Sequence, residues 1–131
     1  MGGGIILRNY RVPTLTIAGS DSSGGAGIQA DLKTFSAIGT YGMSVITAVT
    51  AQNTEGVFAV EELSGEIIKS QIKEIFDDIE PAAVKIGMVS SPEIIVDIVN
   101  TMKKYNPSFL VVDPVMISKS GYSLLKSEAK E

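Results

Sequence analysis

The feature that most constrains the fold is the alternation of strand-like and helix-like segments along the chain. Apolar or β-branched runs predict strands at residues 15–18, 45–50, 56–63, 83–88 and 109–112. Apolar residues at helical spacing predict helices at 26–38 and 65–79, and a third that ends before Asn106. Strands that alternate with helices of this length are typical of βαβ units. The sequence therefore predicts an α/β fold with a doubly wound, mostly parallel sheet flanked by helices.

Local patterns refine three of these elements. The strand at 56–63 is short, and we expect it to be antiparallel or to lie at an edge. Ser90 is expected to cap the third helix, with Pro92 in its first turn and Glu93 completing a capping box. The run at 109–112 is continuously apolar, which predicts a parallel strand covered on both faces.

Composition narrows the class of protein. The 131 residues are 44% hydrophobic and 20% charged, as expected for one globular domain. A net charge of −4 without a basic run argues against nucleic acid as a partner. The absence of cysteine and histidine excludes disulfides and thiol catalysis, and leaves carboxylates and amides as metal ligands. With no apolar run of 18 residues and no secretory signal pattern, we expect a cytoplasmic protein without a membrane segment.

A glycine-rich loop follows the first predicted strand. The strand at 15–18 leads into residues 19–21, and Gly24, Gly25 and Gly27 then precede a helix. Glycines allow backbone N–H groups to approach a ligand closely, and a helix start adds partial positive charge. This construction favours a small-molecule or phosphate site. The alternative is an ordinary glycine-rich connection.

The type of glycine motif is restricted by its neighbours. A Walker loop needs Lys and Ser or Thr after its glycines, whereas Ile28 and Gln29 follow Gly27, which excludes that motif. Residues 25–30 fit the dinucleotide pattern G-x-G-x-x-A. That pattern also requires a glycine directly after the strand and an acidic residue roughly 20 positions on. The next strand instead runs into residues 51–53, so a dinucleotide-binding domain is the weaker hypothesis.

Polar and glycine residues recur where the predicted strands end. They are Gly19-Ser20-Asp21, Gln52-Asn53, Gly87-Met88 and Asp113-Pro114-Val115. In parallel sheets, ligands bind beyond the carboxyl ends of the strands. Any one of these segments could be turn chemistry alone, but together they predict a ligand site at this edge.

Asp31 occupies an unusual position on the first predicted helix. At about 100° per residue it lies in the apolar stripe formed by Ile28, Phe35 and Ile38. A carboxylate among apolar neighbours is costly unless a partner compensates it. Asp31 therefore either caps a nearby backbone turn or has a binding role.

Three segments together resemble a known family. They are residues 19–57 (GSDSSGGAGIQADLKTF and its continuation), KIGM at 85–88 and VVDPVMISKSGYSLL at 111–125. They closely resemble hydroxymethylpyrimidine and phosphomethylpyrimidine kinases of thiamine biosynthesis, in the ribokinase-like superfamily. The resemblance extends from Leu15 to Leu125. It implies that residues 1–131 form the N-terminal half of a ribokinase-like domain, because the family's chains are roughly twice as long.

The resemblance also implies roles for particular residues. The implied substrate contacts are Gly19, Asp31, Gln52, Met88 and Val115. The Gln52 amide would hydrogen-bond the aminopyrimidine ring, and Gly19 would let the backbone lie close to it. Met88 and Val115 would form apolar walls. Asp113 lies where the family brings magnesium and phosphates together.

The half of the family's site that binds adenine and supplies a Gly-Thr-Gly anion hole has no counterpart in residues 1–131. We therefore expect no catalytic residue in this chain, although the family uses ATP and Mg²⁺. The implied function is ATP-dependent phosphorylation of hydroxymethylpyrimidine and its monophosphate. The implied partners are this small-molecule substrate and either a second copy or a chain that supplies the missing half. The alternative is a non-catalytic pyrimidine-binding or assembly module, or the remnant of a truncated gene.

Overall fold

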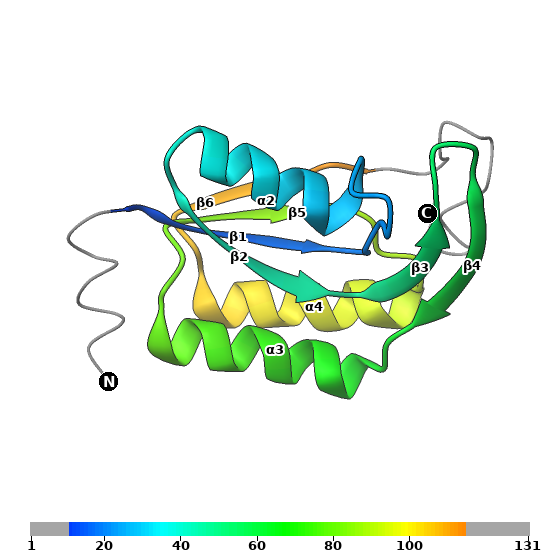
Figure 1. Ribbon diagram of the computed structural model, residues 1–131. Coiled ribbons are helices and arrows are strands. Elements are labelled where there is room, and N and C mark those ends of the chain that lie inside the picture. Colours follow the sequence, from blue (N-terminus) through cyan, green and yellow to red (C-terminus); the bar gives the residue numbers. More distant parts are fainter. Residues whose placement is uncertain (1–10, 115–131) are drawn as a thin grey trace.

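The computed structural model describes residues 11–114, in which helices lie on both faces of a parallel sheet (Figure 1). In chain order the elements are β1 (Pro13–Ala18), α2 (Gly27–Ala37), β2 (Tyr41–Ile46), β3 (Ala48–Gln52), β4 (Val57–Glu62), α3 (Gly65–Asp78), β5 (Ala83–Ile86), α4 (Pro92–Tyr105) and β6 (Phe109–Val112). The main sheet has the order β2-β1-β5-β6, with every pairing parallel. Helix α2 covers one face, and α3 and α4 cover the other. The predicted α/β fold is confirmed.

The apolar core lies between the sheet and the α3–α4 layer. It consists of Leu15, Ile17, Val45, Ile68, Ile72, Val84, Val89, Ile94, Ile98 and Met102. The predicted helix ranges are confirmed, since α2 and α3 match them to within one residue. The apolar stripe predicted for the first helix is wrong at Ile38, which follows α2 as its C-cap and is 69% exposed. None of the helices within residues 11–114 has the length and apolar character needed to cross a bilayer.

The predicted single strand at 45–50 is wrong, because the chain leaves the main sheet at Thr47. The Thr47 N–H donates to the carbonyl of Ala18, and its own carbonyl accepts from Leu63. Strand β2 therefore ends before Thr47, and β3 begins after it in a separate two-stranded sheet. Its partner β4 is antiparallel, which confirms the expectation for residues 56–63.

The start of α4 also differs from its prediction. Ser91, not Ser90, is the N-cap: its Oγ accepts from the N–H of Ile94 at 3.2 Å and donates to Glu93 Oε2 at 2.8 Å. Ser90 instead donates to the carboxylate of Glu62. The capping function is therefore shifted by one residue, and Ser90 joins the β5–α4 loop to β4.

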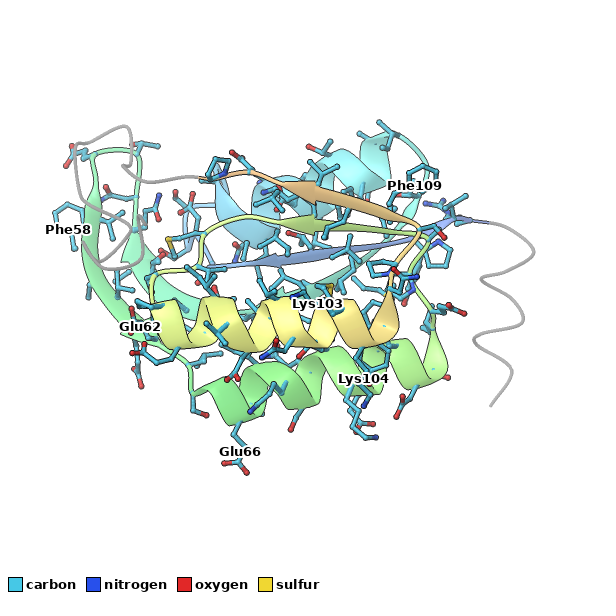
Figure 2. The ribbon with its side chains drawn as sticks, turned by 180° about the vertical axis from the view of Figure 1, so that it is seen from behind. Phe58, Glu62, Glu66, Lys103, Lys104 and Phe109 are labelled. Carbon is cyan, nitrogen blue, oxygen red and sulfur yellow. The ribbon has the colours of Figure 1, made fainter. Side chains whose placement is uncertain are left out.

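Strand β6 is an edge strand rather than a covered one. Its four side chains, Phe109 to Val112, are 46–69% exposed, so the predicted coverage of both faces is wrong for the described structure. Phe109 lies near the end of the sheet opposite the β3–β4 hairpin, which carries Phe58 (Figure 2). Within residues 11–114, β6 hydrogen-bonds along one side only, to β5.

Candidate functional site

The loop between β1 and α2 folds around the buried carboxylate of Asp21. Its Oδ1 accepts from the N–H of Ser23 at 2.8 Å and from the Ser23 hydroxyl at 2.7 Å. Its Oδ2 accepts from the N–H groups of Gly25 at 2.9 Å and Ala26 at 2.8 Å. Burial alone would raise the pKa of Asp21, but the hydrogen bonds from Ser23, Gly25 and Ala26 hold it below its ordinary value. Asp21 is therefore a charged centre that fixes the loop.

The start of α2 is held against the end of β1. Gly27 has a φ of 57°, and a Cβ at this position would overlap the carbonyl oxygen of Gly19. The N–H of Ile28 donates to that same oxygen at 2.9 Å. This N–H and those held by Asp21 donate within the chain, so the prediction that the loop offers them to a ligand is wrong. Gly27 serves close helix–strand packing.

Strand β3 is bound to the same loop and carries Gln52. The Thr50 hydroxyl donates to the Ser20 carbonyl at 2.7 Å, and the Thr50 N–H donates to Ser20 Oγ at 3.0 Å. The Ser22 hydroxyl donates to the carbonyl of Gln52 at 2.5 Å and accepts from its N–H at 2.8 Å. The Gln52 Oε1 lies 3.3 Å from the Thr50 hydroxyl. The backbone of Gln52 is thus fixed beside the loop, and its Nε2 has no partner among the described residues.

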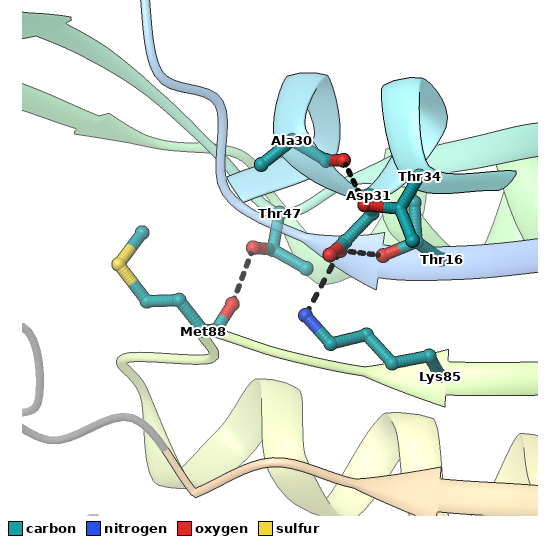
Figure 3. Close-up of polar contacts among 7 residues, drawn as sticks. All are labelled: Thr16, Ala30, Asp31, Thr34, Thr47, Lys85 and Met88. Carbon is teal, nitrogen blue, oxygen red and sulfur yellow. Dashed lines mark hydrogen bonds and ion pairs between the residues drawn. The ribbon is translucent and has the colours of Figure 1, made fainter. Parts of the chain in front are cut away.

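Gly19 and Met88 are in direct contact, although 69 positions separate them in the chain. A Cβ on Gly19 would overlap the terminal methyl of Met88. The main chain of Met88 is fixed in turn, because its carbonyl accepts from the Thr47 hydroxyl at 2.9 Å (Figure 3). The absence of a side chain at residue 19 therefore makes room for the Met88 thioether.

Asp31 pairs with two side chains of the sheet beneath α2. Its Oδ2 accepts from the Thr16 hydroxyl of β1 at 2.6 Å and from Lys85 Nζ of β5 at 2.9 Å (Figure 3). The two charged side chains are 18% and 24% exposed. Neither donor is a backbone N–H, so the alternative that Asp31 caps a turn is wrong. The partner that compensates the Asp31 carboxylate among its apolar neighbours is the ammonium group of Lys85.

Of the two remaining predicted residues, the structure describes Asp113, which directly follows β6. The N–H of Asp113 donates to the carbonyl of Ile86 at 2.8 Å, which sets Asp113 beside the end of β5. Val115 lies outside the described residues. No group of three Asp, Glu, His or Cys within residues 11–114 could hold a metal, so these residues do not form a magnesium site by themselves.

The structure brings Gly19 and Met88 together and places Gln52 on the strand bonded to the residues that follow Gly19. Two contacts were not predicted from the sequence: the hydrogen bonds of Asp21 within its own loop and the pairing of Lys85 with Asp31. The sequence signal for the role of Asp21 is its place directly before Ser-Ser-Gly-Gly, since Asp side chains accept from backbone N–H groups of the turn that follows them. No neighbouring residue of Lys85 indicates its partner, because the pair forms only when the tertiary structure brings β5 close to α2.

This chain is similar in sequence to kinases of one family. The sequence profile of the family described as phosphomethylpyrimidine kinase matches residues 21–131. A hydroxymethylpyrimidine/phosphomethylpyrimidine kinase of Rhizobium meliloti (strain 1021) is 58% identical over 115 residues, which cover 88% of this chain and 43% of that protein. The kinase of the same description from Bacillus subtilis (strain 168) is 51% identical, covering 88% and 42%. The chain therefore spans less than half the length of these relatives.

Solved structures agree with this family and with the fold. A phosphomethylpyrimidine kinase from Clostridium difficile 630 is 80% identical with a TM-score of 0.86, over 92% of this chain and 52% of that one. A pyridoxal kinase from Staphylococcus aureus, solved with AMP-PCP and pyridoxal, is 38% identical with a TM-score of 0.73, over 85% and 41%. The described strands and helices are thus a ribokinase-like arrangement.

Proposed function

Because the chain belongs to the phosphomethylpyrimidine kinase family, we propose that it carries the pyrimidine-binding half of a kinase of thiamine biosynthesis. In the proposed reaction, the hydroxymethyl oxygen of hydroxymethylpyrimidine attacks the γ-phosphorus of ATP, the bond to the bridging oxygen breaks, and ADP leaves as the hydroxyl proton is lost. In a second round, a phosphate oxygen of the monophosphate attacks the γ-phosphorus of another ATP, and ADP leaves again. The protein is proposed to act in the cytoplasm. Its partners are the pyrimidine and either a second copy or a chain that completes the nucleotide site.

The observation that carries this proposal is that the Gln52 side chain has an unused amide donor while its backbone is held in place. Its backbone is fixed to Ser22 on both its N–H and its carbonyl, while Nε2 has no partner within residues 11–114. An amide in this state can donate to a ring nitrogen and accept from the neighbouring exocyclic amine. That pair of contacts matches the polar edge of an aminopyrimidine.

The surrounding residues support the same ligand. Met88, whose terminal methyl fills the space that a side chain on Gly19 would occupy, is proposed to supply a polarizable apolar wall. Gly19 is proposed to contact the ring through its backbone. Asp31 offers a carboxylate to a polar substituent, and Val115 is proposed to complete the apolar wall. Asp113 is proposed to lie near the phosphates and Mg²⁺, whose remaining ligands would come from outside residues 11–114.

Calorimetric titration of hydroxymethylpyrimidine into the 131-residue chain tests the proposal, with pyridoxal as the comparison ligand. We expect hydroxymethylpyrimidine to bind without ATP, and pyridoxal to bind more weakly. Absence of binding would contradict the proposal. A non-catalytic pyrimidine-binding module would bind equally, so the coding DNA beyond Glu131 distinguishes the two. A continuous or separate frame for the nucleotide half supports the kinase, whereas a frameshifted continuation supports a remnant.

A further inference from the structure

The ion pair between Lys85 and Asp31 is the least exposed of the ion pairs seen within residues 11–114. Its side chains are 24% and 18% exposed, against 52% and 34% for the next least exposed pair, Lys69–Asp97. Removing two charges from water is costly, and a buried pair is weak evidence for stability by itself. The burial of this pair is therefore not explained by stability alone.

Lys85 extends along β5 to the carboxyl edge of the sheet. A Cβ on Gly87 would lie 2.9 Å from Lys85 Nζ and 3.0 Å from the Cβ of Ala18. The ammonium group thus lies beside the last residue of β1 and the first residue after β5. The next residues along these two segments are Gly19 and Met88, which contact each other. The pair is therefore contiguous with the proposed pyrimidine site (Figure 3).

The two protein donors use only one oxygen of the Asp31 carboxylate. Thr16 and Lys85 both donate to Oδ2, and Oδ1 accepts from no described residue. Every side-chain oxygen or nitrogen that is fully buried within residues 11–114 has a hydrogen-bond partner. Oδ1 is therefore open to solvent and can accept a hydrogen bond from a ligand.

We propose that Lys85 is a positioning residue that holds Asp31 by Oδ2, so that Oδ1 accepts from the hydroxymethyl group of the substrate. This inference rests on the proposed function. Hydroxymethylpyrimidine has two donors, its exocyclic amine and its hydroxyl. The proposed function pairs the amine with Gln52 Oε1, and this inference pairs the hydroxyl with Asp31 Oδ1. Lys85 acts through Asp31 and defines specificity for a ligand that carries a donor at this substituent.

The test compares two ligands by calorimetry: hydroxymethylpyrimidine, and the analogue with a methyl in place of the hydroxymethyl group. Lys85→Met is expected to weaken hydroxymethylpyrimidine binding about tenfold, because the carboxylate loses its fixed orientation. The same variant is expected to bind the methyl analogue as the parent chain does. Lys85→Arg should restore most of the affinity, and Lys85→Met should add no further loss to Asp31→Asn. Lys69→Met, which removes the lysine of an exposed pair, is the matched control.

The outcomes separate this inference from the proposed function. Equal loss for both ligands would show a merely structural role and overturn the inference. Binding that Gln52→Ala weakens and Lys85→Met leaves unchanged would also overturn it, while the proposed function stands. No binding by the parent chain would overturn both. If circular dichroism shows that Lys85→Met does not fold, Asp31→Asn and Thr16→Val replace it, and the same dependence on the hydroxyl is required.

Discussion

At the scale of single residues, Asp21 shows how one carboxylate can determine the course of a loop. It is 2% exposed and accepts four hydrogen bonds, three of them from backbone N–H groups. Charged acceptors make the stronger hydrogen bonds in proteins. The loop beside Gly19 and Gln52 is therefore stabilised by a buried charge whose hydrogen bonds all lie within the loop.

Replacing Asp21 with Asn should destabilise the fold by about 2 kcal/mol at neutral pH. The substituted amide has one acceptor oxygen, so its NH₂ group would face N–H groups now held by Oδ2. Because the folded pKa of Asp21 is lowered, its stabilisation is present above the unfolded pKa and is lost as pH falls through the folded pKa. Urea unfolding of parent and variant should therefore converge at acidic pH. A constant difference at all pH values, or an equal loss in the exposed Asp77→Asn control, would contradict this account.

Gln52→Ala should weaken hydroxymethylpyrimidine binding by roughly 1–3 kcal/mol, because the polar edge of the ring would lose its partner. Its backbone bonds to Ser22 do not involve the side chain, so the fold should persist. Calorimetry measures the affinity, and Asn100→Ala, which removes an exposed amide on α4, is the control. Equal affinity of the parent and Gln52→Ala would refute the role of Gln52 in pyrimidine recognition.

At the scale of elements, hydrogen bonds from outside a segment decide where it begins and ends. Gln71 of α3 donates to the carbonyl of Ile46 and accepts from its N–H, both at 3.0 Å, so this side chain occupies the backbone groups at the end of β2. Thr47 then bonds to Ala18 and Leu63, and the chain turns into β3. The departure of β3 from the main sheet carries Gln52 over the loop after β1.

Ser91→Ala should lower the free energy of unfolding by about 1 kcal/mol, because the N–H of Ile94 would lose its cap. Ser91→Asp should recover most of this loss, since a carboxylate can accept the same bond and favours a helix start. Thermal and urea unfolding measure the change. Ser70→Ala, at an exposed position of α3, should have little effect. A loss from Ser70→Ala as large as that from Ser91→Ala would argue against the cap.

At the scale of the whole molecule, β6 is an edge strand within residues 11–114, and its apolar side chains are exposed. Phe109, Val111 and Val112 are at least 60% exposed, and an unpaired strand edge is a template for association. The relatives that this chain matches are about twice as long. We therefore expect β6 to be covered by a second chain or by further sequence of the same domain.

The isolated 131-residue chain should sediment as a dimer or larger species, or aggregate, in proportion to its concentration. Val111→Lys should shift it toward the monomer, because a charge on an edge strand opposes pairing. Analytical ultracentrifugation over a concentration series measures this, and Lys103→Met on α4 serves as a surface-charge control. A parent chain that is monomeric at every concentration and unfolds cooperatively would show that β6 needs no cover.

The isolated chain should not transfer the γ-phosphate of ATP to hydroxymethylpyrimidine. Phosphoryl transfer depends on positioning and on charge stabilisation around the γ-phosphate, and residues 11–114 supply neither a metal cluster nor a second glycine-rich anion hole. Labelled ATP provides the assay, with Gln52→Ala as the background. Transfer above that background would mean that this chain contains a complete active site.

The sequence by itself determined most of the elements and the family. The period of the apolar residues is a local property, so α2, α3 and most strands were predicted to within one or two residues. The segment from Gly19 to Val57 was specific enough to indicate the phosphomethylpyrimidine kinase family, which the family profile confirms. Gly19, Gln52 and Met88 could be named as candidate contacts because the family pattern places them at strand ends.

The tertiary structure decided what depends on distant neighbours. The break at Thr47 requires Ala18 and Leu63, and the partner of Asp31 is Lys85, 54 positions away. The exposure of β6 depends on what lies beside it, which an apolar run cannot reveal. Hydrophobic periodicity indicates whether a segment is a helix or a strand. It does not indicate which distant segment will pack against it, because that depends on the tertiary structure.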